Sequence, residues 1–310
     1  MVRIPPETMR EWFRAKAWEL RHRLFTLRRG CDLTMRPFVV AGAPRSGTSL
    51  FCTLLSEKPN VIAVNEPKQI AGRRLLIADP VVTVRGFLTY TANQAFHRGS
   101  IINKVDPESP NQMTTDTWNR GSEYRRIAVD IDTSLAVSVG VKAPVPLFDQ
   151  LGIFGEAWPG LRSLVLFRDP LRTINSWRQS FGWQPGLDDP KKGPAFKIYE
   201  KVGKQGSALE RRARLWKVMA EEALALKQSY SDAILLIRYE EVLADPQGVI
   251  ARAARHIGAP DPDYEIDVSF VRPQSRPNYK HLDDEEVAMI TDICGGAWRK
   301  MVEATGGVSD

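Results

Sequence analysis

The sequence predicts an α/β fold in three layers, with a parallel β-sheet covered by helices on both faces. The first observation is that short apolar runs of strand length alternate with longer helix-compatible segments, which is the pattern of βαβ units. The second is that one such run leads through a turn of small residues directly into a helical segment. The third is size, because 310 residues, 43% of them hydrophobic and 26% charged, can bury a large core.

The first predicted strand, at 38–41, is joined to a helix that starts near 50 by the turn Gly42-Ala43-Pro44-Arg45-Ser46-Gly47-Thr48-Ser49. Such a unit directs backbone N–H groups and the positive end of a helix dipole to one spot, which binds phosphate. The spacing fits the start of the nucleoside-triphosphate loop, but Thr48 stands where that loop has a lysine. Arg45 instead supplies a cation that can hold an anion through two hydrogen bonds. The turn is therefore predicted to bind an oxyanion, the alternative being an ordinary βα turn with a surface arginine.

The remaining elements follow from apolar runs and helical spacing taken in chain order. Further strands are expected at 60–64, 136–141, 163–167 and 233–237. Helices are expected at 68–96 (interrupted at Asp79-Pro80), 145–157, 171–181, 207–230, 246–256 and 283–304. Gly258 is placed to end the helix at 246–256.

The chain is expected to form one domain from 37 to 310, preceded by a basic amphipathic helix within 1–36. Apolar residues recur at helical spacing over 7–29, and Arg and Lys fill most other positions. This helix could contact a membrane surface, but we expect it to pack on the domain with its arginines in solvent. Two inserts are expected in the domain, a long polar loop at about 106–132 and a flexible Gly-, Pro- and Lys-rich insert or lid at 182–206.

Charge and cysteine content narrow the class of ligand. The net charge of +6 suits an anionic ligand, but the basic residues form no long tract and no nucleic-acid-binding module is visible, so we expect no nucleic-acid partner. The three cysteines are widely spaced, which indicates neither a disulfide framework nor a metal site. The sequence has no apolar run of membrane-spanning length and no signal-peptide core, which favours a cytoplasmic protein.

Polar residues follow four of the later predicted strands at the points where these strands end. They are Glu66, Lys142, Arg168 and Tyr239. Because ligands of open parallel sheets bind beyond the carboxyl ends of the strands, we expect these side chains to gather around the oxyanion turn.

At these residues the sequence resembles the sulfotransferases that use 3′-phosphoadenosine 5′-phosphosulfate (PAPS). The stretch Pro44-Arg45-Ser46-Gly47-Thr48-Ser49 is similar to their 5′-phosphosulfate loop. Arg168-Asp169-Pro170, with Ser176 eight residues after the arginine, is similar to their 3′-phosphate motif. The intervals from Arg45 to Glu66, 21 residues, and from Lys142 to Arg168, 26 residues, match the branch that includes the tyrosylprotein sulfotransferases. The segment 238–246 looks like a further family segment, and the resemblance spans about 38–276.

The resemblance implies a P-loop nucleoside-triphosphatase-like sulfotransferase fold, PAPS as sulfuryl donor, adenosine 3′,5′-bisphosphate as product, and no metal. It assigns the 5′-phosphosulfate to Pro44, Arg45, Ser46, Gly47, Thr48 and Ser49. It assigns the 3′-phosphate to Arg168 and Ser176. Tyr239, and Ser275 and Arg276 in a late basic loop, are expected to touch the nucleotide as well.

Sulfuryl transfer resembles phosphoryl transfer, an in-line displacement that depends on positioning and charge stabilisation. Lys142 is expected to reach the bridging oxygen as charge develops there, together with Arg45. Glu66 is the candidate general base that takes the proton of the attacking acceptor. The alternatives are a solvated strand-end lysine for Lys142 and a surface glutamate held by Pro67 for Glu66.

The expected acceptor carries a hydroxyl or an amine, and a glycan, a glycolipid, a tyrosyl peptide and a small metabolite all remain open. A first rival function is a P-loop kinase or nucleotide hydrolase, which would need a lysine at position 48 and a metal-binding carboxylate such as Asp169. A second rival is a non-catalytic protein that binds a nucleotide or another anion. The presence of both Glu66 and Lys142 argues against it, because binding alone needs neither.

Overall fold

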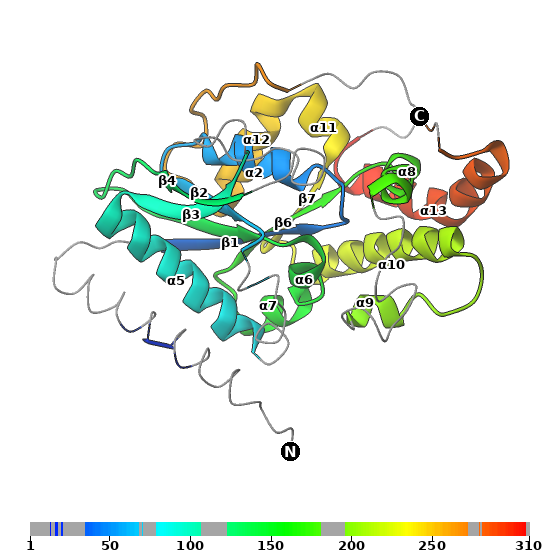
Figure 1. Cartoon of the computed structure of the whole chain (residues 1–310), viewed down its shortest axis with the longest axis horizontal. Coiled ribbons are helices and arrows are strands. Elements are labelled where there is room, and N and C mark those ends of the chain that lie inside the picture. The colour runs from blue at the N-terminus through cyan, green and yellow to red at the C-terminus, as the bar shows by residue number, and fades with distance from the viewer. Residues whose placement is uncertain are drawn as a thin grey trace.

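A five-stranded, fully parallel sheet forms the centre of the molecule (Figure 1). The computed structural model describes residues 13, 16, 17, 20, 35–67, 70, 79–106, 123–180, 196–271, 279 and 281–307. The strands of the sheet are β1 (Met35–Gly42), β2 (Val61–Asn65), β5 (Val137–Lys142), β6 (Arg162–Phe167) and β7 (Ile234–Arg238), in the order β2-β5-β1-β6-β7. The predicted class, a parallel sheet between helical layers, is confirmed.

Helices cover both faces of this sheet, and each face has its own apolar core. On one face lie α2 (Thr48–Ser56), α11 (Tyr239–Ala244) and α12 (Pro246–Ile257), which pack on a cluster that includes Phe38, Val40 and Leu164. The other face carries α5 (Pro80–Arg98), α6 (Pro144–Phe148), α7 (Leu151–Ala157), α8 (Pro170–Ser180), α9 (Lys197–Glu200), α10 (Ala208–Ser229) and α13 (Asp284–Ala304). Figure 1 shows α2 and α12 above the sheet and α5, α6, α7 and α10 below it.

The strands read as nearly continuous apolar runs because both of their faces are buried. Every residue of β5 is buried, and so are the last five residues of β1. The register pairs Val40 of β1 with Lys142 of β5, and Lys142 also pairs with Asn65 of β2. The carboxyl ends of neighbouring strands therefore meet at one edge of the sheet.

Local signals in the sequence set the ends of the helices. Asp79 caps α5 by accepting a hydrogen bond from the N–H of Val82, and Pro80 occupies the first turn. The predicted helix at 68–96 is thus found from Pro80 onward, whereas most of 68–78 lies outside the described residues. Gly258, with φ of 72°, ends α12 as predicted.

The expected loop at about 106–132 contains a strand, so this prediction was wrong over part of its length. Strand β4 (Glu123–Ala128) pairs antiparallel with β3 (Ser100–Val105). Strand β3 was not expected from the sequence either. β4 is polar and largely exposed, so it lacks the alternating apolar residues by which strands are recognised. Residues 107–122 lie outside the described part of the chain.

The other expected segments are described only in part. Of the expected insert at 182–206, residues 196–206 are described and include α9. Of the expected N-terminal helix, the four described residues are helical, and Phe13 and Leu20 expose most of their surface. The division into 1–36 and 37–310 stays a prediction. Among the described helices, none combines the length and apolar character that crossing a bilayer requires.

Candidate active site

The predicted oxyanion turn lies between β1 and α2 and contains two residues in the left-handed region. Arg45 has φ of 66° and Gly47 has φ of 76°. A Cβ atom on Gly47 would lie 2.1 Å from the ring of Tyr239, so only glycine fits there without displacement. Gly47 precedes α2 without a side-chain cap. The first-turn N–H groups of this helix are therefore left to other acceptors, and the positive end of its dipole faces the turn.

The side chains of the turn add buried hydroxyl groups to these amides. Ser46 is fully buried, and its Oγ makes no hydrogen bond to any residue that the structure describes. Ser49 accepts a hydrogen bond from Lys142 Nζ at 3.0 Å. A buried hydroxyl without a partner is uncommon in native proteins, so Ser46 is a candidate for contact with a ligand.

Two residues of α8 form hydrogen bonds with the oxyanion turn. The indole Nε1 of Trp177 donates to the carbonyl of Pro44 at 2.8 Å, and Trp177 is completely buried. Arg45 Nε donates to Ser176 Oγ at 3.1 Å. The predicted 5′-phosphosulfate loop and the predicted 3′-phosphate serine are thus in direct contact, so they belong to one site.

Arg168 directly follows β6 and lies beside Tyr239, the first residue of α11. The Arg168 guanidinium carbon is 4.9 Å from the centre of the Tyr239 ring. Burial lowers the pKa of Arg168, and its Nε has no hydrogen-bond partner among the described residues. Because Tyr239 also packs against Gly47, its ring connects the arginine to the oxyanion turn.

Asp169, the carboxylate that a kinase would need, has a structural role instead. Its Oδ1 accepts a hydrogen bond from the N–H of Arg172 at 2.9 Å in the first turn of α8. Its own N–H donates to Glu240 Oε1 at 3.1 Å. Burial raises the pKa of both Asp169 and Glu240.

Glu66 follows β2 and is held between two lysines. Its Oε1 lies 2.6 Å from Lys142 Nζ, and its Oε2 lies 2.7 Å from Lys104 Nζ. The backbone N–H of Glu66 donates to the carbonyl of Lys142 at 2.7 Å, and the hydroxyl of Tyr124 donates to the carbonyl of Glu66. The side chain of Lys142 is only 2% exposed, so it is not the solvated strand-end lysine that was the alternative.

The charge of Glu66 follows from this environment. Burial by itself would raise the pKa of Glu66, but the charges of Lys142 and Lys104 and their hydrogen bonds to the carboxylate lower the pKa to about 2. Glu66 is therefore ionised throughout the neutral range. Burial, followed by the charge of Glu66, raises the pKa of Tyr124 to about 12, which keeps the phenol protonated and able to donate.

Four of the predicted site residues are thus placed around one turn, and two further residues were missed. Glu66, Lys142, Arg168 and Tyr239 lie where the strand ends predicted them. Lys104 and Tyr124 escaped prediction because they lie on the hairpin of β3 and β4, outside the parallel sheet. The short apolar run at 100–105, interrupted by Asn103 and Lys104, is the sequence signal that could have identified β3. Ser275 and Arg276 lie outside the described residues.

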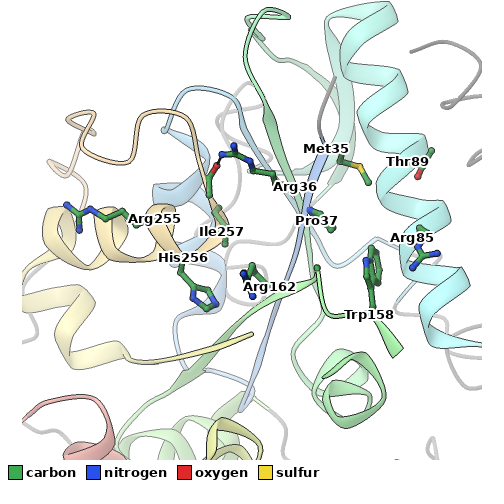
Figure 2. Close-up of a pocket in the computed structure, with 12 residues that line it drawn as sticks. Met35, Arg36, Pro37, Arg85, Thr89, Trp158, Arg162, Arg255, His256 and Ile257 are labelled. Carbon is green, nitrogen blue, oxygen red and sulfur yellow. Dashed lines mark hydrogen bonds between the residues drawn. The ribbon is translucent and has the colours of Figure 1, made fainter. Parts of the chain in front are cut away.

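A second basic region lies at the opposite end of the sheet and takes no part in this site. A cavity of about 600 Å³ lies at the start of β1 and β6, lined by Arg36, Arg85, Arg162 and Arg255 among others, and Figure 2 shows these side chains. Arg36 donates to the carbonyl of Gly258 at the end of α12, and Arg162 donates to the carbonyl of Asp232 at 2.9 Å. Arg36 and Arg162 thus complement backbone carbonyls. The residues that line the cavity include none of the predicted site residues.

Comparison with known proteins identifies the family of this chain. The family model described as "Sulfotransferase family" matches residues 37–263. Nodulation protein H of Rhizobium meliloti (strain 1021) is 26% identical over 249 residues, which cover 74% of this chain and 79% of the relative. Nodulation protein H of Rhizobium tropici is 20% identical over 275 residues, which cover 86% and 93%.

Solved structures also align with the chain over most of its length. The sulfotransferase from Alicyclobacillus acidocaldarius is 16% identical, with a TM-score of 0.45 and coverage of 88% of this chain and 96% of the other. Retinol dehydratase in a complex with retinol and PAP is 13% identical, with a TM-score of 0.38 and coverage of 91% and 85%. From the match of the family model to most of its length, the chain belongs to the sulfotransferase family. It is a sulfotransferase enzyme.

Proposed function

We propose that this enzyme transfers a sulfuryl group from PAPS to an acceptor hydroxyl or amine by in-line displacement. The observation that carries the proposal is the position of Lys142. Its ammonium contacts Ser49 of the oxyanion turn at 3.0 Å and Glu66 at 2.6 Å. One buried cation thus connects the place where the donor's charge would lie with the group that would take the acceptor's proton.

The residues of the turn fit an anionic donor. Ser46 offers a buried hydroxyl, and the uncapped start of α2 offers backbone N–H groups. These groups, with Arg45, Thr48 and Ser49, would hold the 5′-phosphosulfate. Arg168, whose Nε is buried without a partner among the described residues, would hold the 3′-phosphate together with Ser176. Contacts from Ser275 and Arg276 remain predictions for a segment that the structure does not describe.

When bound, PAPS supplies the electrophilic sulfur and a phosphate leaving group. Glu66 takes the proton of the acceptor as its oxygen or nitrogen attacks. Lys142 and Arg45 stabilise the negative charge that develops on the bridging oxygen. Adenosine 3′,5′-bisphosphate is the product that the same residues release.

The rival readings explain fewer of these features. A P-loop kinase or nucleotide hydrolase would use a lysine at position 48, but Thr48 occupies it and is buried. Asp169, the candidate metal carboxylate, caps α8. A protein that only binds a nucleotide has no use for Glu66, a carboxylate held against the Lys142 ammonium that contacts the oxyanion turn.

The proposal includes the broad class of acceptor and the cellular setting. The acceptor carries a nucleophilic hydroxyl or amine, as a glycan, a glycolipid, a tyrosyl peptide or a small metabolite does. A cytoplasmic location remains a proposal from the sequence. So does the packing of residues 7–29 on the domain, with contact of this segment with a membrane surface as the alternative.

The experiment is incubation of the purified full chain with ³⁵S-labelled PAPS and a cell extract, followed by identification of labelled products. The same incubation with γ-labelled ATP tests the kinase reading. We expect a labelled product from PAPS with the wild type and none with Glu66→Gln. Label transferred from ATP, or product formation that Glu66→Gln leaves unchanged, would overturn the proposed function.

A further inference from the structure

We propose that the hairpin of β3 and β4 is part of the catalytic centre, and that Lys104 is a positioning residue that holds Glu66 in place for proton transfer. This inference rests on the proposed function, in which Glu66 is the base. It adds two residues, Lys104 and Tyr124, that neither the motifs nor the family match singles out. Four observations support it.

The side chain of Asn103 fixes the hairpin to the outer edge of β2. The Oδ1 atom of Asn103 accepts a hydrogen bond from the N–H of Asn65 at 2.8 Å, and its Nδ2 donates to the carbonyl of Ala63 at 3.0 Å. Asn103 is completely buried. Its amide therefore replaces the backbone of a neighbouring strand and sets the position of the next residue, Lys104, relative to Glu66.

Lys104 and Tyr124 are opposite each other in the hairpin and share one of its faces. The Lys104 ammonium lies 5.6 Å from the centre of the Tyr124 ring. From this face Lys104 reaches Glu66 Oε2, and Tyr124 donates to the backbone carbonyl of Glu66. The hairpin thus contacts both the carboxylate and the backbone of Glu66.

The backbone of Glu66 explains why such support is needed. Glu66 has φ of 45°, in the left-handed region that non-glycine residues seldom adopt. Residues in that region persist where surrounding contacts determine them, and they are concentrated at functional sites. The bond from Tyr124, with the bond from the N–H of Glu66 to the carbonyl of Lys142, fixes the peptide groups on both sides of Glu66.

Each of the two lysines pairs with a different oxygen of the Glu66 carboxylate. Lys142 holds Oε1 and also contacts the donor turn through Ser49, whereas Lys104 holds Oε2 and is 14% exposed. If Lys142 turns toward the bridging oxygen of the donor, Oε1 loses its cation and its affinity for a proton increases. Lys104 still holds Oε2, so the carboxylate cannot rotate away.

The acceptor heteroatom forms a bond to sulfur while the bond from sulfur to the bridging oxygen breaks. The leaving phosphate keeps the electron pair of the broken bond, next to Lys142. The acceptor's proton moves to Glu66 Oε1 and is later released to water.

The test compares Lys104→Met with Lys104→Arg, which keeps the charge, and with Lys201→Met as a matched control. Lys201 forms a pair of similar length with Glu222, 2.6 Å, on the exposed surface. We expect Lys104→Met to lower kcat for sulfuryl transfer by about 10- to 100-fold, with the Kd for adenosine 3′,5′-bisphosphate unchanged within about twofold of wild type. Lys104→Arg should recover part of the loss, and Lys201→Met should behave as wild type. A kcat for Lys104→Met equal to that of Lys201→Met would overturn the proposal.

A second measurement needs neither donor nor acceptor. The carboxyl ¹³C signal of Glu66, assigned by its loss in Glu66→Gln, is followed against pH. In the wild type it should stay at its ionised position down to about pH 4, because the pKa is about 2. In Lys104→Met it should begin to titrate at higher pH, since one of the two cations is gone. An unchanged titration would show that Lys104 does not act on Glu66. If the wild type transfers no label from PAPS, the proposed function fails by itself, and this titration still decides the action of Lys104.

Discussion

Glu66 is a carboxylate whose two oxygens are each paired with a lysine, on a backbone of unusual conformation. This combination suits the proposed role of Glu66 as a base better than a purely stabilising role. A glutamate that only neutralised Lys142 would need neither a left-handed backbone nor a second cation. Its pKa of about 2 describes the site with both lysines in place. In the proposed mechanism, the carboxylate gains affinity for a proton when Lys142 turns toward the donor.

Substitution of Glu66 by Gln should separate chemistry from binding. The amide keeps the size of the side chain but cannot take a proton at this position, so we expect turnover to fall by about 10²- to 10⁴-fold. The affinity for adenosine 3′,5′-bisphosphate, measured by calorimetry, should stay close to that of the wild type, because Glu66 contacts Lys142 rather than the proposed phosphate ligands. Turnover near the wild-type value in this variant would remove Glu66 from the mechanism.

Arg168 should contribute to binding rather than to the chemical step. Its Nε is buried without a hydrogen-bond partner among the described residues, and a charged hydrogen bond to phosphate is worth about 1.5–3 kcal/mol. Arg168→Ala should therefore weaken binding of adenosine 3′,5′-bisphosphate by about 10- to 100-fold. Arg178→Ala is the matched control, since Arg178 lies on α8 and pairs with Glu286 on the surface. Equal calorimetric affinities for the two variants would refute the assignment of the 3′-phosphate.

At the scale of elements, the decisive unit is the turn between β1 and α2, which several neighbours hold in place. Trp177 of α8 binds the carbonyl of Pro44, and the Tyr239 ring of α11 packs on Gly47. Because these contacts come from elements that follow β6 and β7, the parts assigned to the two ends of the donor are assembled together. The geometry of the turn should therefore depend on the position of Tyr239.

Gly47→Ala tests that dependence. An added methyl group would meet the Tyr239 ring at 2.1 Å, and the residue has φ of 76°. Gly203→Ala is the control, because Gly203 has φ of 75° and nothing lies within 4 Å of the added Cβ. We expect Gly47→Ala to lower the free energy of unfolding by about 1–3 kcal/mol more than Gly203→Ala does, as measured by urea denaturation. Equal losses would mean that the ring moves aside without resistance.

At the scale of the whole molecule, the charge on Glu66 links stability to pH. The pKa is about 2 in the folded protein against an ordinary value of 4.5, so the unfolded chain binds the proton more readily. The stabilisation by the ionised carboxylate is complete above about pH 4.5 and is lost as the pH falls toward about 2. Urea denaturation of the wild type between about pH 6 and pH 3 should show this loss, and Glu66→Gln should lack that component. Parallel curves for the two proteins would contradict this role of the Glu66 charge.

The sequence allowed the main sheet and most of the site to be predicted, for a physical reason. Runs such as the one that contains Val39 are apolar because the sheet is covered on both faces, and their ends identify Glu66, Lys142 and Arg168. The hairpin of β3 and β4 could not be predicted in the same way. β4 is exposed and polar, and its pairing with β3 depends on contacts across a long separation in the chain. Lys104 therefore became visible only when the hairpin was placed beside β2.

The attachment of the hairpin through the Asn103 amide affects which sequence changes the fold tolerates. Because side chains such as that of Asn103, rather than a ladder of backbone bonds, attach the hairpin to β2, residues of the hairpin that do not contact β2 can be substituted without shifting the register of the five strands. Variation in this arm would alter what approaches Glu66 while leaving the donor's turn untouched. The Asn103 amide also occupies the N–H of Asn65 and the carbonyl of Ala63, which could otherwise pair with a strand of another polypeptide.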